Sequence, residues 1–405
     1  MSELECWIWF SNLRRLRWRT RKALLRRYGG ARELWFADPR EIETLPGLLP
    51  EERRELSNRS DEDVKQIVRR CAEEHVRILT FQDAAFPERL RNIPDPPYVL
   101  YVKGELPAVD AEPVIAVVGT RHSTDYGERM ARRIASELAA CGGTVVTGLA
   151  AGIDSRAAEG ALDAGGRVLG VLGVAVNKVY PSSNAALYKR VEANGALISE
   201  YPPDAQGTKE WFPQRNRIIA GLCLGVVVAE APERSGALIT AHRALDYGRD
   251  VYAVPANADS VKGRGSNRLI KEGAALITEG WDVLENYEAF YPERIAKRDA
   301  ELPDAQPPEE TAEPEPTGKG FFRFRSPNRK RTEEDKGLLE AQLELLTEQQ
   351  LKIVGVMNSP SMHVDDIIDL SGLPTSAVLS ELTMLQIKGF VSQEPGKRFT
   401  LNISK

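Results

Sequence analysis

Six short runs of consecutive apolar residues, separated by segments of helical periodicity, constrain the fold of this chain more than any other feature of its sequence. Strands that are apolar on both faces belong in parallel sheets that helices cover on each side. The alternation therefore predicts a Rossmann-like, doubly wound and mostly parallel α/β sheet. Ligands of such sheets bind at the carboxyl ends of the strands. The runs are 114–118, 145–146, 168–172, 196–198, 226–229 and 251–254.

The rest of the 405 residues differs in composition from this central part. Residues 11–32 hold nine Arg or Lys and no acid, interleaved with apolar residues, and predict a basic amphipathic helix. Residues 300–316 hold five Pro and six acids without a base, which indicates a flexible linker that we place at 291–337. A basic cluster with three Phe at 319–331 lies within it, and we interpret it as a solubilised tether. Residues 338–405 show two short amphipathic helices and a hairpin pattern, which predict a winged helix.

Composition excludes several classes of protein. No apolar run approaches the roughly 18 residues of a membrane helix, and Glu3 and Glu5 stand where a signal peptide would be basic. The four cysteines are each more than sixty residues apart, which argues against disulfide frameworks and structural zinc. We expect a cytoplasmic protein with no metal and no membrane contact. The net charge of −5 does not by itself favour binding to nucleic acid. The distribution of charge along the chain is therefore more informative than its sum.

The first central strand runs into Gly119-Thr120-Arg121, before a helix expected near residue 128. Glycine lets an anion approach the backbone, a helix amino end favours negative charge, and Arg121 offers a fork for phosphate. The turn predicts an anion site, with a structural salt bridge of Arg121 as the alternative. A GxGxxG fingerprint is missing, so we predict no dinucleotide and no other cofactor. The next turn, 147–154, is more typical of a pocket wall, with Asp154 capping the helix that follows.

Residues 209–217 place three cations and two aromatic rings between the fourth strand and a helix. Single-stranded nucleic acid is bound by this mixture, because cations contact its backbone and bases stack on ring faces. The segment predicts a single-strand contact. The alternative is an ordinary helix entry whose Phe212 fills the core.

Two glutamates leave an enzymatic alternative open. Glu200 and Glu230 both stand just past strand ends, where they could act as nucleophile and acid in cleaving an N-glycosidic bond of a nucleotide. We favour helix-cap or arginine-partner roles for both. His122 and His242 have no spaced Ser, Cys or metal-ligand partner. A nucleotide-sensing regulator is a third alternative.

A succession of motifs over about residues 75–280 has a recognisable order and spacing. The motifs are Val118-Gly119-Thr120-Arg121, Thr147-Gly148-Leu149-Ala150, Gly152-Ile153-Asp154, Tyr180-Pro181, Ser199-Glu200-Tyr201-Pro202-Pro203, Phe212-Pro213-Gln214-Arg215-Asn216-Arg217, Ser235-Gly236-Ala237-Leu238 and Gly265-Ser266-Asn267-Arg268. This succession resembles the DprA/Smf family of bacterial DNA-processing proteins. The resemblance also implies a small helical domain of the SAM or helix-hairpin-helix type at 1–72, a Rossmann-like domain at 73–290 and the winged helix at 338–405. A turn at 45–48 looks like a helix-hairpin-helix turn, although its second glycine is missing.

The resemblance implies a function as well. It implies a non-enzymatic protein that binds and protects single-stranded DNA, self-associates as a homodimer and loads the RecA recombinase during natural transformation. The DNA-binding residues that it implies are Gly119, Thr120, Arg121, Lys209, Phe212, Arg215, Asn216, Arg217, Ser235 and Gly236.

The chain departs from the family pattern at three places and in its charge. Ala158 replaces a usual His, and Ala175 and Ala256 replace usual glycines, so DNA affinity is expected to change while the fold survives. The winged helix carries eight acids against five bases, and its recognition helix offers only Lys388. Since phosphate neutralisation supplies most DNA affinity, we predict that this domain contacts protein.

Overall fold

The computed structural model describes residues 1–297, 346–357, 362–387, 390–394 and 398–401. Its contacts divide the chain into two compact units, Met1–Glu309 and Glu310–Lys405. Most of the predicted linker, including the basic cluster at 319–331, lies outside the described residues. Residues 291–297 of the predicted linker belong to the first unit, where Ile295 is buried and the Tyr291 hydroxyl accepts a hydrogen bond from Arg89. No described helix is long and apolar enough to cross a membrane.

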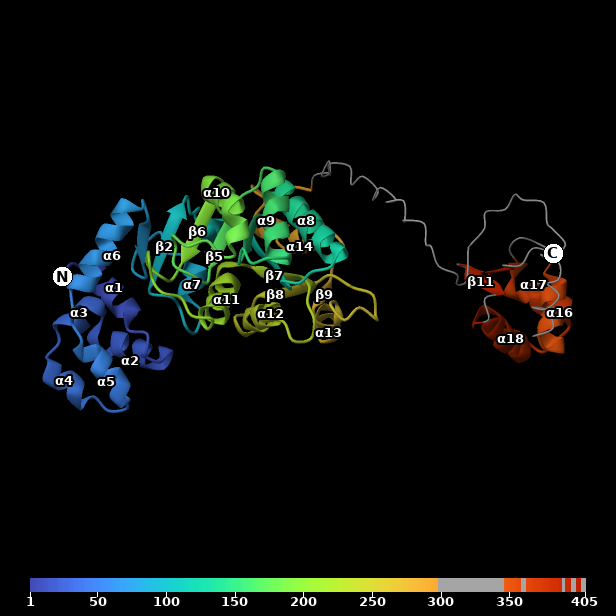
Figure 1. Ribbon diagram of the computed structural model, residues 1–405, viewed down its shortest axis with the longest axis horizontal. Helices are drawn as coiled ribbons and strands as arrows, with labels where there is room; N and C mark the ends of the chain where they lie inside the picture. The colour runs from blue at the N-terminus through green and yellow to red at the C-terminus, as the bar shows by residue number, and fades with distance from the viewer. Residues whose placement is uncertain (298–345, 358–361, 388–389, 395–397, 402–405) are drawn as a thin grey trace, which may run out of the picture. The chain divides into compact units, whose positions relative to one another are not determined.

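A nine-stranded sheet in the order β1-β2-β6-β5-β4-β3-β7-β8-β9 forms the centre of the first unit (Figure 1). From β6 to β9 all neighbouring strands are parallel, which confirms the predicted Rossmann-like sheet. Each of the six predicted apolar runs overlaps one of these strands. The strands are β1 Arg77–Thr80, β2 Val99–Gly104, β3 Val114–Gly119, β4 Thr144–Thr147, β5 Val168–Leu172, β6 Gly195–Ser199, β7 Gly225–Glu230, β8 Asp250–Ala253 and β9 Ala275–Leu276.

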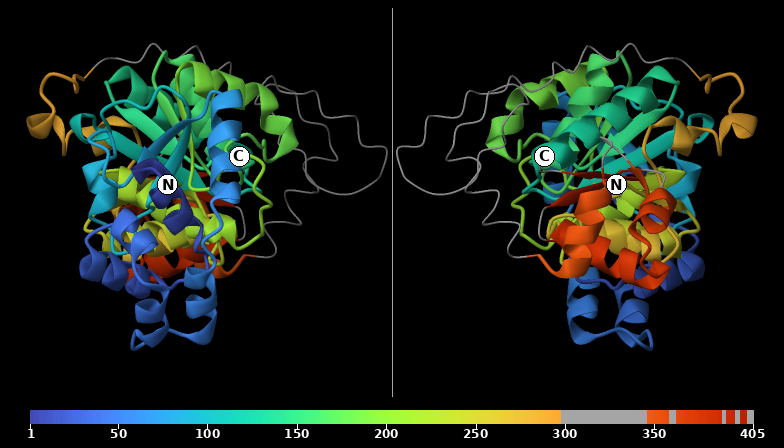
Figure 2. Two further views of the ribbon diagram at one scale, coloured as in Figure 1. Left: turned by 90° about the vertical axis from the view of Figure 1, so that its left-hand side faces the viewer. Right: turned by 90° about the vertical axis from the view of Figure 1, so that its right-hand side faces the viewer.

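Helices cover both faces of this sheet, as Figures 1 and 2 show. Alternate residues of a strand point to opposite faces, so Ala116 packs in one core and Ile115 and Val117 in the other. One layer contains α8 Asp125–Ala140, α9 Ile153–Asp163, α10 Ala185–Ala193 and α14 Trp281–Leu284. The other contains α7 Glu88–Arg91, α11 Trp211–Leu222, α12 Gly236–Asp246 and α13 Arg264–Lys271. Both cores consist mainly of buried aliphatic side chains, which pack the strands firmly against the helices.

The two antiparallel strands β1 and β2 at one end of the sheet were not predicted. β2 pairs antiparallel with both β1 and β6, where Tyr101 lies opposite Ser199. Tyr101 and its neighbour Val99 are buried under the amino-terminal helices, so β2 has no solvent face. Its first four residues, 99–102, form an apolar run of the same kind as the six predicted strands, and the prediction missed it.

Six helices form the amino-terminal module, which packs against β1 and β2 at one edge of the sheet (Figure 1). The prediction of one basic helix over 11–32 is wrong, because α1 ends at Asn12 and α2 begins at Trp18. Arg17 lies in the turn between them and pairs with Glu52. The helices are α1 Glu3–Asn12, α2 Trp18–Tyr28, α3 Ala31–Phe36, α4 Pro39–Thr44, α5 Pro50–Ser57 and α6 Glu62–Glu73.

Glu52 is a fully buried carboxylate that ties α2 to α5. Its oxygens accept hydrogen bonds from Arg17 Nε at 3.0 Å, Arg17 Nη2 at 2.9 Å, Thr20 Oγ1 at 2.8 Å and the Leu49 amide at 2.9 Å. Burial by itself would raise the pKa of Glu52, but the hydrogen bonds from Arg17, Leu49 and Thr20 outweigh it and lower the pKa to about 2. The charged form of Glu52 therefore stabilises the module.

We expect Glu52→Gln to lower the free energy of unfolding of the module by about 2–3 kcal/mol at pH 7, because charged hydrogen bonds are lost. The folded pKa lies below the ordinary value of 4.5, so this stabilisation is complete above pH 4.5 and disappears as the pH falls towards 2. Urea unfolding followed by tryptophan fluorescence at pH 7 and pH 3 measures the difference, with the exposed Glu51→Gln as control. If the stability difference between wild type and Glu52→Gln is larger at pH 3 than at pH 7, the charged form of Glu52 does not stabilise the module.

The second unit forms the winged helix that the sequence predicted. It contains α16 Glu348–Val356, β10 Met362–His363, α17 Val364–Ser371, α18 Thr375–Ile387, β11 Val391–Glu394 and β12 Arg398–Leu401. The strands pair antiparallel in the order β10-β12-β11. Ile367, Val378, Leu382 and Phe399 lie in its small core. Its contact with protein rather than DNA stays a prediction.

Candidate nucleic-acid interface

A pocket of about 640 Å³ lies at the carboxyl ends of β3, β4 and β7. The chain runs from β3 through α8 to β4 on one side, and from β7 through α12 to β8 on the other. Loops that leave adjacent strands in opposite directions open a crevice at this switch point, where α/β sheets bind their ligands. The pocket occupies that position.

Nine of the ten predicted DNA-binding residues line this pocket; Arg217 does not. Three separate segments bring them together: the turn after β3, the start of α11 and the loop after β7. The nine are Gly119, Thr120, Arg121, Lys209, Phe212, Arg215, Asn216, Ser235 and Gly236.

An aromatic pair with a cation on it forms one wall of the pocket. The rings of Phe212 and Tyr180 lie 5.1 Å apart, and the Arg121 guanidinium lies 5.1 Å from the centre of the Phe212 ring. A Cβ at Gly173 would come within 2.7 Å of this ring, so only glycine leaves room for it. Phe212 is partly exposed and does not fill the core, contrary to the alternative of an ordinary helix entry. The wall offers a ring face and a cation side by side.

The charge of the pocket is strongly positive. Its lining includes five cations, Arg121, Lys209, Arg215, Arg234 and Lys262, and a single acid, Asp154. Among the described residues, no carboxylate pairs with Arg121, Lys209, Arg234 or Lys262. Cations that no internal acid neutralises are available to an anionic ligand.

Arg215 contributes its charge from beneath the surface. Its side chain is buried and donates from Nη1 to the Gly148 carbonyl at 2.8 Å and to the Val171 carbonyl. Burial lowers the pKa of this guanidinium, and the carboxylate of Asp154 acts in the opposite direction. A Cβ at Gly148 would come within 2.4 Å of Nη2, so this glycine makes room for the arginine. Arg215 thus fixes the ends of β4 and β5 under the pocket.

Arg217 lies on the opposite side of α11 from the pocket. Residues advance about 100° each around a helix, so Arg217 is about 200° from Arg215. Arg217 Nη2 pairs with Glu200 at 2.6 Å, and its Nε lies 3.3 Å from Asp95. Burial alone would lower the pKa of Arg217, but Glu200 and Asp95 raise it above its usual range. Arg217 was predicted to bind DNA together with the pocket cations, but the structure places it outside the pocket.

The backbone of the turn after β3 is already hydrogen bonded within the protein. The Gly119 amide donates to Asp154 Oδ1 at 3.3 Å and the Thr120 amide to the Glu230 carbonyl at 2.8 Å. The amino end of α8 is occupied as well, because Glu230 accepts from the Thr124 amide at 2.8 Å. The anion position predicted at this helix end is therefore filled by a carboxylate. The amides of Gly119 and Thr120 therefore have internal acceptors, and we expect the exposed Arg121 side chain to make the phosphate contact of this turn.

Asp154 does not cap its own helix, contrary to the prediction. It is the second residue of α9, and its Oδ2 accepts from the Gly148 amide at 3.1 Å. Burial raises the pKa of this carboxyl, while Arg215 and the amides of Gly119 and Gly148 act to lower it. Asp154 joins the turns after β3 and β4, so the glycine-rich turn forms part of the pocket wall as expected.

The two glutamates of the enzymatic alternative do not line the pocket. Glu200 pairs with Arg217, and Glu230 is buried against Thr124 at the start of α8. A Cβ at Gly127 would come within 2.5 Å of Glu230 Oε2, which leaves no space for a substrate there. These are the arginine-partner and helix-cap roles that we favoured.

Ser235, Gly236 and Asn216 connect the third segment to α11. Ser235 caps α12 by accepting from the Ala237 amide at 3.3 Å. Asn216 Nδ2 donates to the Gly236 carbonyl at 3.2 Å. A Cβ at Gly236 would meet no atom within 4 Å, so this residue faces the open pocket.

Three further pocket residues, Tyr180, Arg234 and Lys262, were missed. Arg234 follows β7 and Lys262 follows β8, so their positions past strand ends were the available signal. Tyr180 stands far from Phe212 in the sequence, and only the fold places the two rings together.

The three departures from the family pattern are accommodated without strain. Ala158 is a residue of α9 and is buried in the core, and Ala175 is buried after β5. Neither Ala175 nor Ala256 is among the described residues with a positive φ. The fold tolerates all three alanines, and their effect on DNA affinity stays a prediction.

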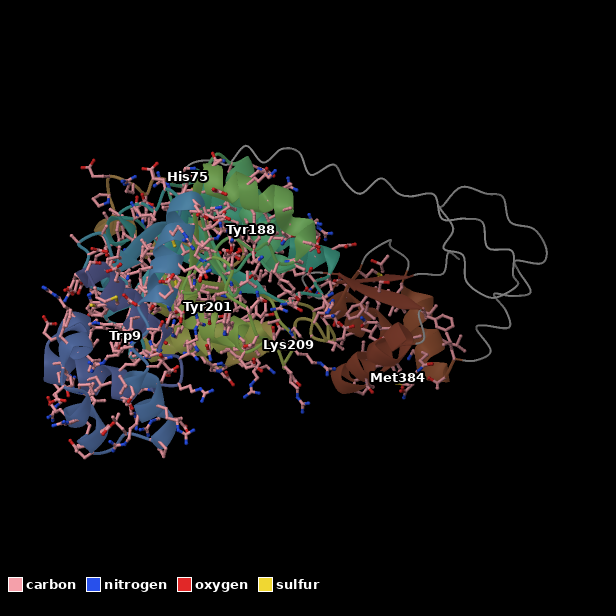
Figure 3. All side chains as sticks on the ribbon, turned by 60° about the vertical axis from the view of Figure 1, so that its left-hand side comes forward. Trp9, His75, Tyr188, Tyr201, Lys209 and Met384 are labelled. Atoms are coloured by element: carbon pink, nitrogen blue, oxygen red, sulfur yellow. The ribbon has the colours of Figure 1, made fainter. Side chains whose placement is uncertain are left out.

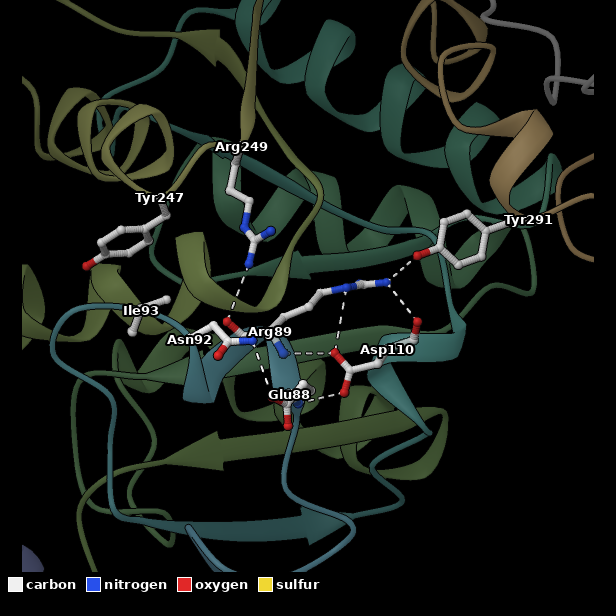
Figure 4. Close-up of a pocket in the computed structure, with 8 residues that line it drawn as sticks. All are labelled: Glu88, Arg89, Asn92, Ile93, Asp110, Tyr247, Arg249 and Tyr291. Atoms are coloured by element: carbon white, nitrogen blue, oxygen red, sulfur yellow. Dashed lines mark hydrogen bonds and ion pairs between the residues drawn. The ribbon is translucent and has the colours of Figure 1, made fainter. Parts of the chain in front are cut away.

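A different pocket of about 330 Å³ lies at the amino ends of β7 and β8 (Figure 4). Its Arg89 donates to the carbonyl oxygens of Glu112 at 2.9 Å and Asp110 at 3.1 Å, and to the Tyr291 hydroxyl. The Asp110 carboxylate accepts from the amides of Glu88 and Arg89. The second arginine of the pocket, Arg249, donates to the Arg89 carbonyl at 3.4 Å. Because both arginines have internal acceptors, this pocket serves to join segments of the fold.

The fold and the first pocket define a Rossmann-like α/β protein with a cationic, aromatic-walled pocket at the switch point of its sheet. Residues 77–288 match the family model described as DNA recombination-mediator protein A, and residues 339–397 match the DprA winged helix domain. The chain therefore belongs to the DNA recombination-mediator protein A family, and its role lies in DNA processing and recombination mediation.

Individual relatives agree with this membership. Protein Smf of Synechocystis is 34% identical over 348 residues, which cover 85% of each chain. The DNA processing protein DprA of Bacillus subtilis is 35% identical over 259 residues, covering 62% of this chain and 87% of that protein. The crystal structure of DprA from Streptococcus pneumoniae matches with a TM-score of 0.62 at 32% identity, covering 70% of this chain and 98% of that chain. The resemblance inferred from the motifs is confirmed.

Proposed function

We propose that this protein binds single-stranded DNA in the pocket at the switch point without breaking a bond in it. The observation that carries the proposal is the wall of Arg121, Phe212 and Tyr180, where an unpaired cation lies on an accessible ring pair. Phosphates would contact Arg121, Lys209, Arg234 and Lys262, and a base would stack on the rings. Gly119, Thr120, Asn216, Ser235 and Gly236 would shape the pocket, and Arg215 would support its floor.

The proposal extends to partners through family membership. Proteins of this family are the DNA processing proteins of their hosts, and we propose that this chain protects incoming single strands and loads RecA in natural transformation. This role would place it in the cytoplasm. The same family membership leads us to propose a homodimer, for which the side chain of Leu276 on the edge strand β9, 52% exposed, is a candidate contact.

A titration of single-stranded and duplex oligonucleotides across a salt series tests the DNA-binding step. Binding to Z phosphates gives a slope of log affinity against log salt of about −0.7Z for single strands. We expect tighter binding to the single strand and a slope of about −2 to −3, for three or four phosphate contacts. Preference for duplex, or an affinity independent of salt, would contradict the proposal. Release of free base from the bound strand would instead favour the enzymatic alternative.

A further inference from the structure

A second groove, of about 350 Å³, lies on the other side of α11, where the amino-terminal module meets the sheet unit. Side chains on one face of α11, including Phe212, line the first pocket, whereas Trp211 and Gln214 line the groove. The groove also contains Arg14 and Trp18 of the amino-terminal module. None of the predicted DNA-binding residues except the paired Arg217 reaches it.

The groove and the pocket share a rim. Lys209 lines the pocket, while its chain neighbours Thr208 and Glu210 line the groove. Consecutive Cα atoms are about 3.8 Å apart, so a strand that leaves the pocket over Lys209 enters the groove directly. Figure 3 shows Tyr201, which lines the groove, between Trp9 of the helical module and Lys209 in that view.

The groove carries an excess of positive charge. Its acids Asp95 and Glu200 are both engaged by Arg217. Among the described residues, no carboxylate pairs with Arg14, Arg21 or Arg243, which leaves Glu210 as the acid opposing three cations. Arg21 is held by the Leu13 carbonyl at 2.6 Å, so Arg14 and Arg243 are the cations available to a ligand.

Aromatic rings accompany these cations. Tyr201 and Trp211 stack with ring centres 3.6 Å apart and planes 4° apart. The Arg14 guanidinium lies 4.7 Å from both ring centres, which places it beside the stack and leaves its donors free. Trp18 is 38% exposed, and the Arg19 guanidinium lies 5.2 Å from its ring centre, so part of the ring surface is open to a base beside a further cation. Cations next to an accessible ring are the combination that binds single strands without sequence preference.

We infer that this groove is a second contact for the same single strand, which continues from the pocket across Lys209 onto the amino-terminal module. The inference rests on the proposed function. Arg14 and Arg243 hold phosphates there, and Trp18 stacks a base. Glu210 opposes the strand by charge repulsion.

Oligothymidylates of roughly 4 to 16 nucleotides, the range of site sizes of single-strand-binding folds, separate the two sites. A short oligomer occupies the pocket alone, and a long one reaches the groove. We expect Arg14→Ala combined with Trp18→Ala to weaken binding of the long oligomers about tenfold or more, and to leave the shortest oligomer that binds unaffected. For long oligomers the salt slope becomes less negative by about 0.7, because one phosphate contact is lost.

Two more variants make the test independent of folding. Arg243→Ala, on α12, gives the same length-dependent loss without touching the amino-terminal module. Glu210→Gln should tighten the binding of long oligomers and leave the binding of short oligomers unchanged. The control Arg54→Ala removes an exposed arginine of α5 outside the groove. It should change the binding of neither short nor long oligomers.

Equal losses for short and long oligomers, or no loss for either, would overturn the second contact while leaving the pocket in place. If wild-type protein binds no oligomer of any length, the proposed function itself fails. The midpoint of thermal unfolding is measured for each variant. A loss of binding that depends on oligomer length, at an unchanged midpoint, supports the second contact in the groove.

Discussion

Replacing Arg121 by Ala is expected to weaken single-stranded DNA binding by about 10- to 100-fold at moderate salt, because one charged hydrogen bond to phosphate is worth about 1.5–3 kcal/mol. The salt slope should become less negative by about 0.7, the contribution of one phosphate. Arg121 is exposed and has no carboxylate partner among the described residues, so the free energy of unfolding should change by less than about 0.5 kcal/mol.

Phe212→Ala separates stacking from charge at the same wall. It should lose about 1–3 kcal/mol of binding while the salt slope stays that of the wild type, since the ring contacts no phosphate. Lys189→Ala removes an exposed cation of α10, far from the pocket lining, and serves as the charge control. If Arg121→Ala binds with unchanged affinity and slope, the strand does not pass along the aromatic wall.

Arg217→Met should have a large effect of a different kind, a loss of about 3 kcal/mol in the free energy of unfolding. The guanidinium is nearly buried between Glu200 and Asp95, and removing one partner of a buried ion pair leaves the other charge uncompensated. Urea unfolding at neutral pH measures the loss.

The partner carboxylate provides the internal control for this variant. Glu200→Gln combined with Arg217→Met removes both charges and should recover part of the stability, because the penalty of an isolated buried charge is gone. The exposed Arg129→Ala on α8 controls for general loss of an arginine. Unchanged unfolding of Arg217→Met would show that this arginine has no structural role, contrary to the geometry.

Much of the pocket follows from local pattern. The apolar runs specify parallel strands, and the turn after β3 and the segment before α11 stand where ligands of such sheets bind. Residue types then point to a phosphate and a base, because only cations and rings in combination suit both. β2 carries a similar apolar run at 99–102, but its antiparallel pairing with β1 and β6 is a tertiary contact that the run does not specify.

What residue order alone established is the sheet, the winged helix and nine of the residues that line the pocket, since apolar periodicity and strand ends are local properties. Tertiary packing decided which of two buried arginines of α11 lies under the pocket. Arg215 and Arg217 stand on opposite sides of α11, and each met a different internal partner, carbonyl oxygens for one and carboxylates for the other. It also decided that Glu230 fills the start of α8. The reason is physical: a buried charge must find its partner in space, and that partner is remote in the chain.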